Sequence, residues 1–257
     1  MGISSGRQLR KRARKEPHEF FVIHYSCQSL YDDNRESMSP RITSIIVSHL
    51  GSGQSLSFST HAIAEELGIS REEVRGNFDA VERQLLRSFF QFIANNRQKY
   101  WVHWNMRNLT FGFEHLEHRY RVLTNATPPE IPVDRRVNLN DIFAEHFGDG
   151  YAAHPRLRSL MELNGGVHRD FLGGEEEVLA FEQNEFLRMH NSTHAKTGFI
   201  SKAFNRFIRG KLVTANRELG VWLDRTFESR LTRGVALFGA LASIPLGIYQ
   251  AYLWWWK

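Results

Sequence analysis

Side chains able to act in acid–base or nucleophilic chemistry are concentrated near residue 25. Within five positions the chain carries His24, Ser26, Cys27 and Gln28. A histidine paired with a carboxylate can transfer protons, and a cysteine beside a histidine has the residue types of a nucleophile pair. Neighbouring side chains of a strand point to opposite faces, so adjacency alone does not form such a pair. We therefore expect Cys27 to be a small buried residue and His24 to make a structural hydrogen bond.

A second group combines rings, amides and a guanidinium at residues 103–108, His-Trp-Asn-Met-Arg-Asn. Such groups stack on bases and hydrogen-bond to base edges or phosphates, so a nucleotide or the end of a nucleic acid is an expected ligand. The alternative is that the rings fill the core beneath a strand while the amides cap the next helix. The candidate ligand-binding residues are Ser26, Gln28, His103, Asn105, Arg107 and Asn108.

Three imidazoles and two acids are candidates for catalysis in an altered site. An imidazole and an acid could work as general acid and base. Clustering of the imidazoles around a polar cleft would favour a hydrolase, whereas scattering would remove that possibility. A single cysteine cannot supply a zinc-finger ligand set, and we expect no metal site. The candidate catalytic residues are His24, His103, His168, Glu175 and Glu176.

The elements that must position these residues indicate an α/β domain. Apolar, β-prone runs predict three successive strands, at residues 20–25, 42–50 and 55–60. A helical repeat of apolar residues follows at 71–96, and a fourth strand at 100–104. Further helices are expected at about residues 111–122, 139–147, 154–163, 175–190 and 193–211.

Residues 24–30, His-Tyr-Ser-Cys-Gln-Ser-Leu, come at the end of the first predicted strand. They are similar to the first motif of the DEDD-type 3′–5′ exonucleases, Asp-x-Glu-Thr-x-Gly-Leu, with His24 and Ser26 at the positions of the two carboxylates. Residues 103–105 and the following Phe-Gly-Phe resemble the second motif, with Gly112 at the position of the metal-binding Asp.

Residues 160–169 resemble the approach to the third motif of that family, in which a His precedes an Asp by five positions on the last helix. The offset from His168 falls on Gly173, with Glu175 and Glu176 slightly beyond. The resemblance covers residues 20–186 and implies an RNase H-like fold, a mixed sheet flanked by helices. In that family the carboxylates bind two metal ions that activate water. Because the motifs here keep at most a displaced Glu, we expect no divalent metal or other cofactor, and a cleft that has been kept for binding or given another chemistry.

The basic excess of the chain is local. The formal net charge is +5, and six arginines and lysines without an acid lie in the first fifteen residues. We expect residues 1–18 to form a flexible basic tail, which attracts phosphates or anionic lipid. The single cysteine and an N-terminal sequence without the apolar run of a secretory signal favour a reducing, cytosolic compartment.

Residues 234–256 contain no charged side chain. At 1.5 Å per residue they span about 34 Å as a helix, enough to cross a hydrocarbon core of about 30 Å. The three tryptophans at the end of this stretch suit the interfacial aromatic belt. The expected division of the chain is a basic tail, an exonuclease-like domain, basic juxtamembrane helices and a transmembrane anchor, at residues 1–18, 19–192, 193–232 and 233–257.

Charge also predicts the orientation of this anchor. Residues 187–217 carry seven lysines and arginines and no acid, which places the N-terminal side in the cytoplasm. Gly239, Ser243 and Gly247 form a stripe of small residues that allows association of two anchors. We therefore expect a single-pass protein of the cytoplasmic (inner) membrane whose degenerate domain binds nucleic acid or a nucleotide, as a sensor or effector, for example in antiviral defence. The alternatives are a hydrolase or nuclease with an altered His/Glu site and a membrane-tethered protein-interaction scaffold.

Overall fold

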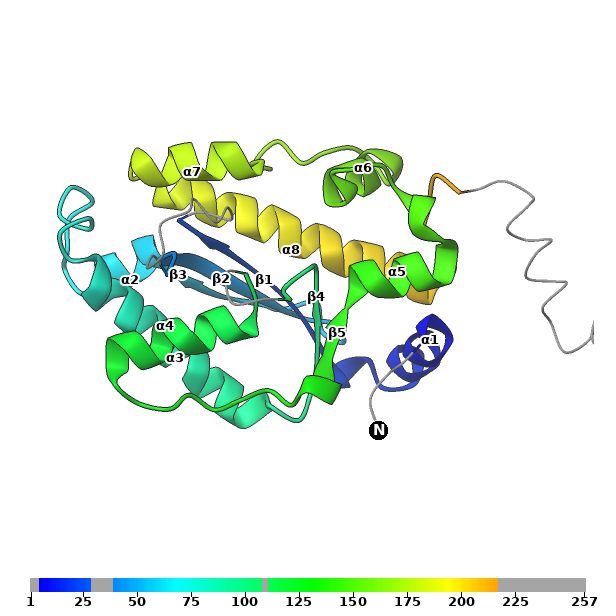
Figure 1. Cartoon of the computed structure of the whole chain (residues 1–257), viewed down its shortest axis with the longest axis horizontal. Coiled ribbons are helices and arrows are strands. Elements are labelled where there is room, and N and C mark those ends of the chain that lie inside the picture. Colours follow the sequence, from blue (N-terminus) through cyan, green and yellow to red (C-terminus); the bar gives the residue numbers. More distant parts are fainter. Residues whose placement is uncertain (1–4, 29–38, 108–110, 217–257) are drawn as a thin grey trace, which may run out of the picture.

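A mixed five-stranded sheet lies at the centre of the computed structural model, which describes residues 5–28, 39–107 and 111–216 (Figure 1). Its spatial order is β3-β2-β1-β4-β5. The first three strands pair antiparallel, and β4 and β5 continue the sheet parallel to β1. The strands are β1 (Phe20–Cys27), β2 (Ile42–His49), β3 (Ser55–Ser59), β4 (Tyr100–His103) and β5 (Arg136–Asn138).

Helices cover both faces of this sheet. The longest one, α8, runs along one side, while α3 and α4 lie along the other (Figure 1). The helices are α1 (Gly6–Lys15), α2 (Thr60–Glu66), α3 (Phe78–Asn96), α4 (Phe113–Thr124), α5 (Leu139–Phe147), α6 (Arg156–Leu163), α7 (Gly174–Glu182) and α8 (Phe186–Ile208). Three 3-10 turns join them: η1 (Pro17–Glu19), η2 (Val133–Arg135) and η3 (Asp149–Tyr151).

Alternation along β1 divides the apolar core into two halves. Ile23 and Tyr25 pack with α3 and α4, whereas Phe20 and Val22 pack with α1, α5 and the second half of α8. The even-numbered side chains of β1 therefore face α8. This places Ser26 and its neighbour two positions earlier, His24, under that helix.

The predicted α/β arrangement with a mixed sheet flanked by helices is confirmed, and the four predicted strands are present. The short strand β5 and the helix α2 were not predicted. The helix expected at 175–190 is two helices, α7 and α8, because Asn184 between them adopts a left-handed φ of 56°. The helix expected at 71–96 begins only at Phe78, after a series of turns.

The expected flexible tail is a docked helix over residues 6–15. Leu9 and Ala13, one turn apart on α1, are buried against α5 and α8. Arg14 donates from Nε and Nη2 to the carbonyl oxygen of Ile208, at 2.9 and 2.5 Å. The helix is also held by the backbone N–H of Gly6, which donates to Glu145 Oε2 at 3.0 Å, and by Arg10, whose guanidinium lies over the Phe207 ring.

The expected boundary at residue 192 falls inside α8. The second half of this helix belongs to the domain core, since Ile200, Phe204 and Phe207 are buried there. Residues 193–208 are therefore part of the folded domain and not a separate juxtamembrane segment. No helix within residues 5–28, 39–107 and 111–216 has the length and apolar character to cross a bilayer. The predicted anchor at 233–257 lies outside the described residues.

Candidate functional site

A buried polar cluster lies between the carboxyl-terminal half of β1, the neighbouring β2 and the first half of α8. Thr193 donates from Oγ1 to Ser26 Oγ at 2.8 Å, and Ser44 Oγ hydrogen-bonds with His190 Nδ1 at 2.9 Å. All members of this cluster are at most 6% exposed. It consists of Ser26, Ser44, Glu177, Ser192, Thr193 and Lys196.

The charged part of the buried polar cluster is an ion pair between α7 and α8. Lys196 donates from Nζ to Glu177 Oε1 at 2.6 Å, and Ser192 Oγ donates to the same oxygen at 3.3 Å. Burial raises the pKa of the Glu177 carboxyl, while the neighbouring Lys196 acts to lower it. Each charge is therefore compensated inside the protein, and the cluster is closed to solvent.

His24 lies beside this cluster with its ring 5.7 Å from the ring of Phe111. Burial, with smaller contributions from the nearby Lys196 and His103, lowers the pKa of His24 to about 3, so the imidazole is neutral at pH 7. Its Nδ1 is buried and has no hydrogen-bond partner in the described parts of the chain, so the expected structural hydrogen bond is missing at that atom. Cys27 is buried, as expected.

His103 lies on the opposite face of the sheet. It pairs with Ile23 in the register of β1 and β4, and its ring is 5.5 Å from that of Phe113. Its Nδ1 accepts the backbone N–H of Met106 at 3.2 Å. Burial lowers its pKa to about 3, with the nearby Arg136 as the next cause. His103 thus has a structural role in ordering the chain after β4.

His168 belongs to neither group. It is exposed on the loop before α7, where its Nδ1 lies 3.6 Å from Asp170 Oδ2. The three candidate imidazoles therefore lie on two faces of the sheet and on a surface loop. They form no common site, and the hydrolase alternative that depended on their clustering receives no support from the geometry.

The two candidate acids lie at the start of α7. Glu176 accepts the backbone N–H of Gly173 at 2.7 Å and so caps the helix, while Glu175 is exposed. The buried carboxylate is the next one, Glu177. Helical spacing could have identified it, because Glu177, Ala180 and Phe181 lie on one buried face.

The expected ligand-binding residues divide into buried and exposed groups. Ser26 is in the buried polar cluster, Gln28 is half-buried, and Asn108 lies outside the described residues. Asn105 and Arg107 are exposed beyond the carboxyl end of β4, where Arg107 forms an ion pair with Asp141 and donates to Asn105 Oδ1.

Asn138, at the end of β5, completes this exposed amide cluster. It donates to Asp141 Oδ2 at 2.8 Å and accepts the backbone N–H of Asn105 at 3.1 Å. Asn105 adopts a left-handed φ of 55°, a conformation that asparagine tolerates better than most residues. The cluster is internally paired and orders the loop after β4.

The residues at the carboxylate positions of the resembled exonucleases do not fit two divalent cations. His24, Ser26 and Gly112 take these positions, and Gly112 donates its N–H to the Tyr25 hydroxyl at 2.9 Å. Magnesium-like ions need several oxygen ligands. Here the ammonium group of Lys196, a positive charge, lies near His24 instead. Within the described ranges, no three His, Cys, Asp or Glu side chains are grouped so as to hold a metal ion.

A pocket of about 690 Å³ lies between α2, the segment before α7 and the α7–α8 junction. Its apolar lining is formed by Ala64, Ile69, Val74, Phe171, Leu172, Phe186 and Leu187. Its uncharged polar lining is formed by His61, Asn184 and Asn191. Three arginines, Arg71, Arg169 and Arg188, and four acids, Glu65, Asp170, Glu176 and Glu185, complete it.

Comparison of the chain with protein-family models, with curated protein sequences and with solved structures gave no match. The pocket is therefore interpreted from its own residues. Two of its lining atoms, His61 Nδ1 and Asn184 Oδ1, are buried without a hydrogen-bond partner among the described residues. A buried polar atom without a partner costs about 1–3 kcal/mol, so these two atoms make the pocket a candidate site for a ligand with polar groups.

One wall separates this pocket from the buried polar cluster. The backbone N–H of Leu172 donates to Ser192 Oγ at 3.1 Å, and Lys196 Nζ lies 5.0 Å from the centre of the Phe171 ring. On the opposite wall, the ring of His61 lies 4.8 Å from the ring of His190, which hydrogen-bonds with Ser44 of the cluster. This pocket was not predicted from the sequence, because its lining comes from two separate segments, residues 61–74 and 169–191, that meet only in the folded chain.

Proposed function

We propose that this chain is a membrane-anchored protein with an RNase H-like domain that binds a nucleotide, or the end of a nucleic-acid strand, without cleaving it. The observation that carries the proposal is the buried Lys196–Glu177 pair beside a pocket of ligand size. His24 and Ser26 take two carboxylate positions of the resembled motif, and the cation Lys196 lies near His24, so this place lacks the carboxylates that bind two metal ions in cleavage of the resembled kind.

The sheet supports the RNase H-like part of the proposal. Three antiparallel strands followed by two strands parallel to β1, in the order β3-β2-β1-β4-β5, agree with the mixed sheet expected from the resemblance. The last helix of the described domain, α8, contributes Thr193 and Lys196 opposite Ser26 and His24. The hydrogen bond from Thr193 to Ser26 thus joins α8 to the strand that carries the first of the resembled motifs.

The composition of the pocket supports the ligand class. A volume of about 690 Å³ is within the usual range for small-molecule sites. The apolar lining and the Phe171 ring suit the face of a base, the asparagines and His61 suit its polar edge, and Arg71 suits a phosphate. Because four acids also line the pocket, it favours a ligand with one phosphate over a polyphosphate.

The anchor gives this binding domain its place in the proposal. Residues 233–257 would hold the protein in the inner membrane with the pocket in the cytosol, and Gly239, Ser243 and Gly247 would allow two anchors to associate. Ligand binding and anchor association in one chain suit a sensor or effector, for example in antiviral defence.

Binding and cleavage are tested with the full-length chain in detergent. Fluorescence anisotropy with labelled five-nucleotide DNA and RNA strands and with nucleoside monophosphates as competitors should give saturable binding. Asn191→Trp places a large ring in the pocket from an exposed position and should weaken binding at least tenfold. The matched control is Val122→Trp on α4, where the replaced side chain is 58% exposed and remote from the pocket lining.

Two outcomes would contradict the proposal. Equal affinity of Asn191→Trp and the unmodified chain would remove the pocket as the binding site. Shortening of the labelled strands in the presence of Mg²⁺ or Mn²⁺ would show that the domain is an active nuclease.

A further inference from the structure

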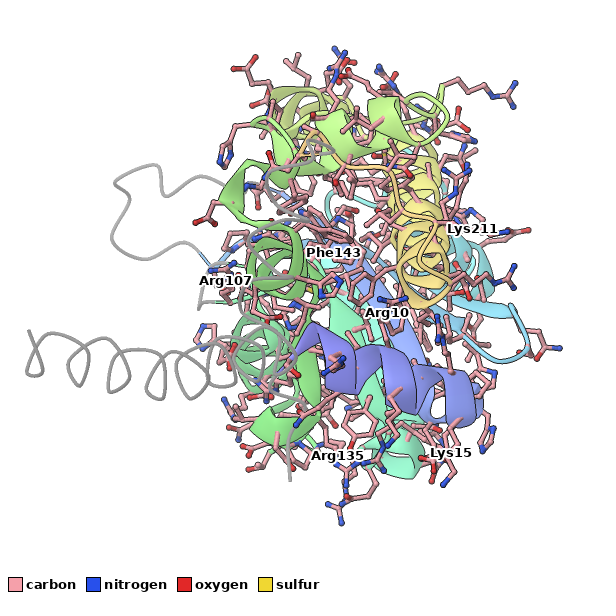
Figure 2. All side chains as sticks on the ribbon, turned by 90° about the vertical axis from the view of Figure 1, so that its right-hand side faces the viewer. Arg10, Lys15, Arg107, Arg135, Phe143 and Lys211 are labelled. Carbon is pink, nitrogen blue, oxygen red and sulfur yellow. The ribbon has the colours of Figure 1, made fainter. Side chains whose placement is uncertain are left out.

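The end of the molecule formed by α1 and the last turns of α8 carries a dense group of cations. Figure 2 faces this end, with Arg10 on α1 beside α8 and Lys211 just beyond the end of α8. Two basic hollows, of about 710 and 620 Å³, lie on it. We call this surface the basic face, formed by Arg7, Arg10, Lys11, Arg14, Lys202, Arg206, Arg209 and Lys211.

Direct contacts join the two halves of the basic face. Arg14 donates to the carbonyl oxygen of Ile208, and the Arg10 guanidinium lies 5.6 Å from the centre of the Phe207 ring. Burial lowers the pKa of Arg10, and the neighbouring charge of Arg14 lowers it further, which reflects crowding of like charges. The two helices therefore present their cations as one surface with a fixed arrangement.

These cations are not neutralised by acids of the described chain. None of the eight forms an ion pair with a carboxylate of residues 5–28, 39–107 or 111–216. Six of them are exposed, and only Arg10 and Arg206 are half-buried. Arg12 and Lys15, on another side of α1, pair instead with Glu16. The basic face therefore has the charge and the exposure to bind a surface of phosphates.

The chain leaves the domain at this same end. After α8 it turns back, and Ala215 donates its backbone N–H to the carbonyl oxygen of Tyr151 at 2.8 Å. Asn216, the last described residue, donates to the carbonyl oxygen of Phe147 on α5, which packs against α1 (Figure 1). Sixteen residues then remain before the predicted anchor at 233, which span at most about 55 Å when extended.

We propose that the basic face binds the phosphate-bearing headgroups of anionic lipids in the membrane that holds the anchor, and so fixes the orientation of the domain. Lipid is favoured over single-stranded nucleic acid, because such strands are bound through exposed aromatic rings. The rings at this end of α8, Phe204 and Phe207, are buried. The proposal depends on the anchor but not on the ligand of the pocket.

The test uses the full-length chain in lipid nanodiscs, made either of phosphatidylcholine alone or with 30% phosphatidylglycerol. Acetylation of individual lysines is measured by mass spectrometry. With anionic lipid, acetylation of Lys11, Lys202 and Lys211 should slow about tenfold, and 0.5 M NaCl should abolish the protection. Lys15, whose side chain is 80% exposed outside the basic face, should react at the same rate in both nanodiscs.

A charge reversal and its matched control make this test specific. Arg209→Glu changes an exposed residue of the basic face and should reduce the protection at least threefold. Arg87→Glu makes the same change in net charge at an exposed position of α3, on the other face of the sheet, and should leave the protection unchanged.

Three results would overturn the proposal. Equal acetylation in the two nanodiscs would show that the basic face does not contact anionic lipid. Protection in neutral nanodiscs by 10 mM inorganic phosphate, or by a DNA duplex at physiological salt, would assign the face to free phosphate or to nucleic acid. Failure of the chain to co-elute with either nanodisc would contradict the anchor as well. Loss of nucleotide binding to the pocket would leave this proposal unaffected.

Discussion

Four histidines of the domain are held in environments that oppose their protonation. Burial lowers the pKa of His24 and His103 to about 3 and the pKa of His115 and His190 to about 4. His115 receives a hydrogen bond from or donates one to Tyr25, depending on its tautomer, and also lies 2.9 Å from the carbonyl oxygen of Pro40. Neutral imidazoles thus serve as core residues on both faces of the sheet.

This arrangement predicts loss of stability in mild acid. An unfolded histidine has a pKa near 6.5, so below that pH the unfolded chain binds protons that the folded chain excludes. The stabilisation is present above about pH 6.5 and is lost as the pH falls toward 4 and 3. As the pH falls through this range, each histidine lowers the free energy of unfolding by up to about 1.4 kcal/mol per pH unit.

Urea unfolding of the full-length chain at pH 7.5, 6.0 and 5.0 checks this prediction. The midpoint should fall steadily, and His24→Leu should reduce the slope because it removes one of the contributing histidines. Glu82, Glu117 and Glu177 have raised pKa values and oppose the trend, since their contribution grows as they protonate. A midpoint that stays constant from pH 7.5 to 5.0 would contradict the histidine assignment.

At the scale of elements, α1 shows how little apolar surface is needed to dock a helix. Leu9 is fully buried among side chains of α5 and α8, whereas most of the helix is exposed. Ser5 caps its start by accepting the backbone N–H of Gln8 at 3.3 Å. Because one leucine makes most of the apolar contact, docking of α1 depends on that residue.

Leu9→Ala should therefore lower the free energy of unfolding by about 2–5 kcal/mol, the usual cost of a cavity left by a buried leucine. Arg7→Ala, at an exposed position of the same helix, should change it by no more than about 0.5 kcal/mol. Thermal unfolding of the two variants in the same detergent compares them directly. Equal stability of both would mean that α1 is not docked in solution.

The elements that the sequence predicted share a simple signal. The strands at residues 20–25 and 42–50 are runs of β-branched and aromatic residues, and each is buried on both faces. β5 lies at an edge of the sheet and has only three residues, which are too few to show an alternating pattern. In α1 the apolar signal is two residues among many cations, so composition favoured an unstructured tail.

The candidate site was harder to predict, because its residues come together only through tertiary contacts. The motifs pointed to Ser26 and to the start of α7, whereas the buried ion pair is formed by Glu177 and Lys196, nineteen positions apart. In the sequence, Lys196 is one of many basic residues before the predicted anchor. Only the packing of α7 on α8 shows that it is an internal charge.

At the scale of the whole molecule, one end of the domain collects α1, α5 and the exit of the chain. The pocket lies at the α7–α8 junction, at the opposite end of α8 from the basic face. A domain held through its basic face would thus keep the pocket away from the bilayer and open to the cytosol.

The anchor itself is tested by extraction. The full-length chain should stay in the membrane pellet after treatment with carbonate at pH 11, because an apolar stretch of 23 residues cannot leave the bilayer without exposing its whole surface. Replacement of Leu241 and Ile244 by Arg should move the protein to the supernatant, since each buried charge opposes insertion. Release of the unmodified chain by carbonate would show that it does not span the membrane.

The fastening of the chain after α8 also has a mechanical consequence. Asn164 is buried, and its side-chain amide donates to the carbonyl oxygen of Val213 and accepts the backbone N–H of the same residue. Tension from the membrane side would load these short hydrogen bonds, and the bond from Ala215 to Tyr151, before it reached α8. If the predicted anchor holds the chain in a membrane, the hydrogen bonds of Asn164 would keep such tension from reaching α8, the helix that lines the pocket.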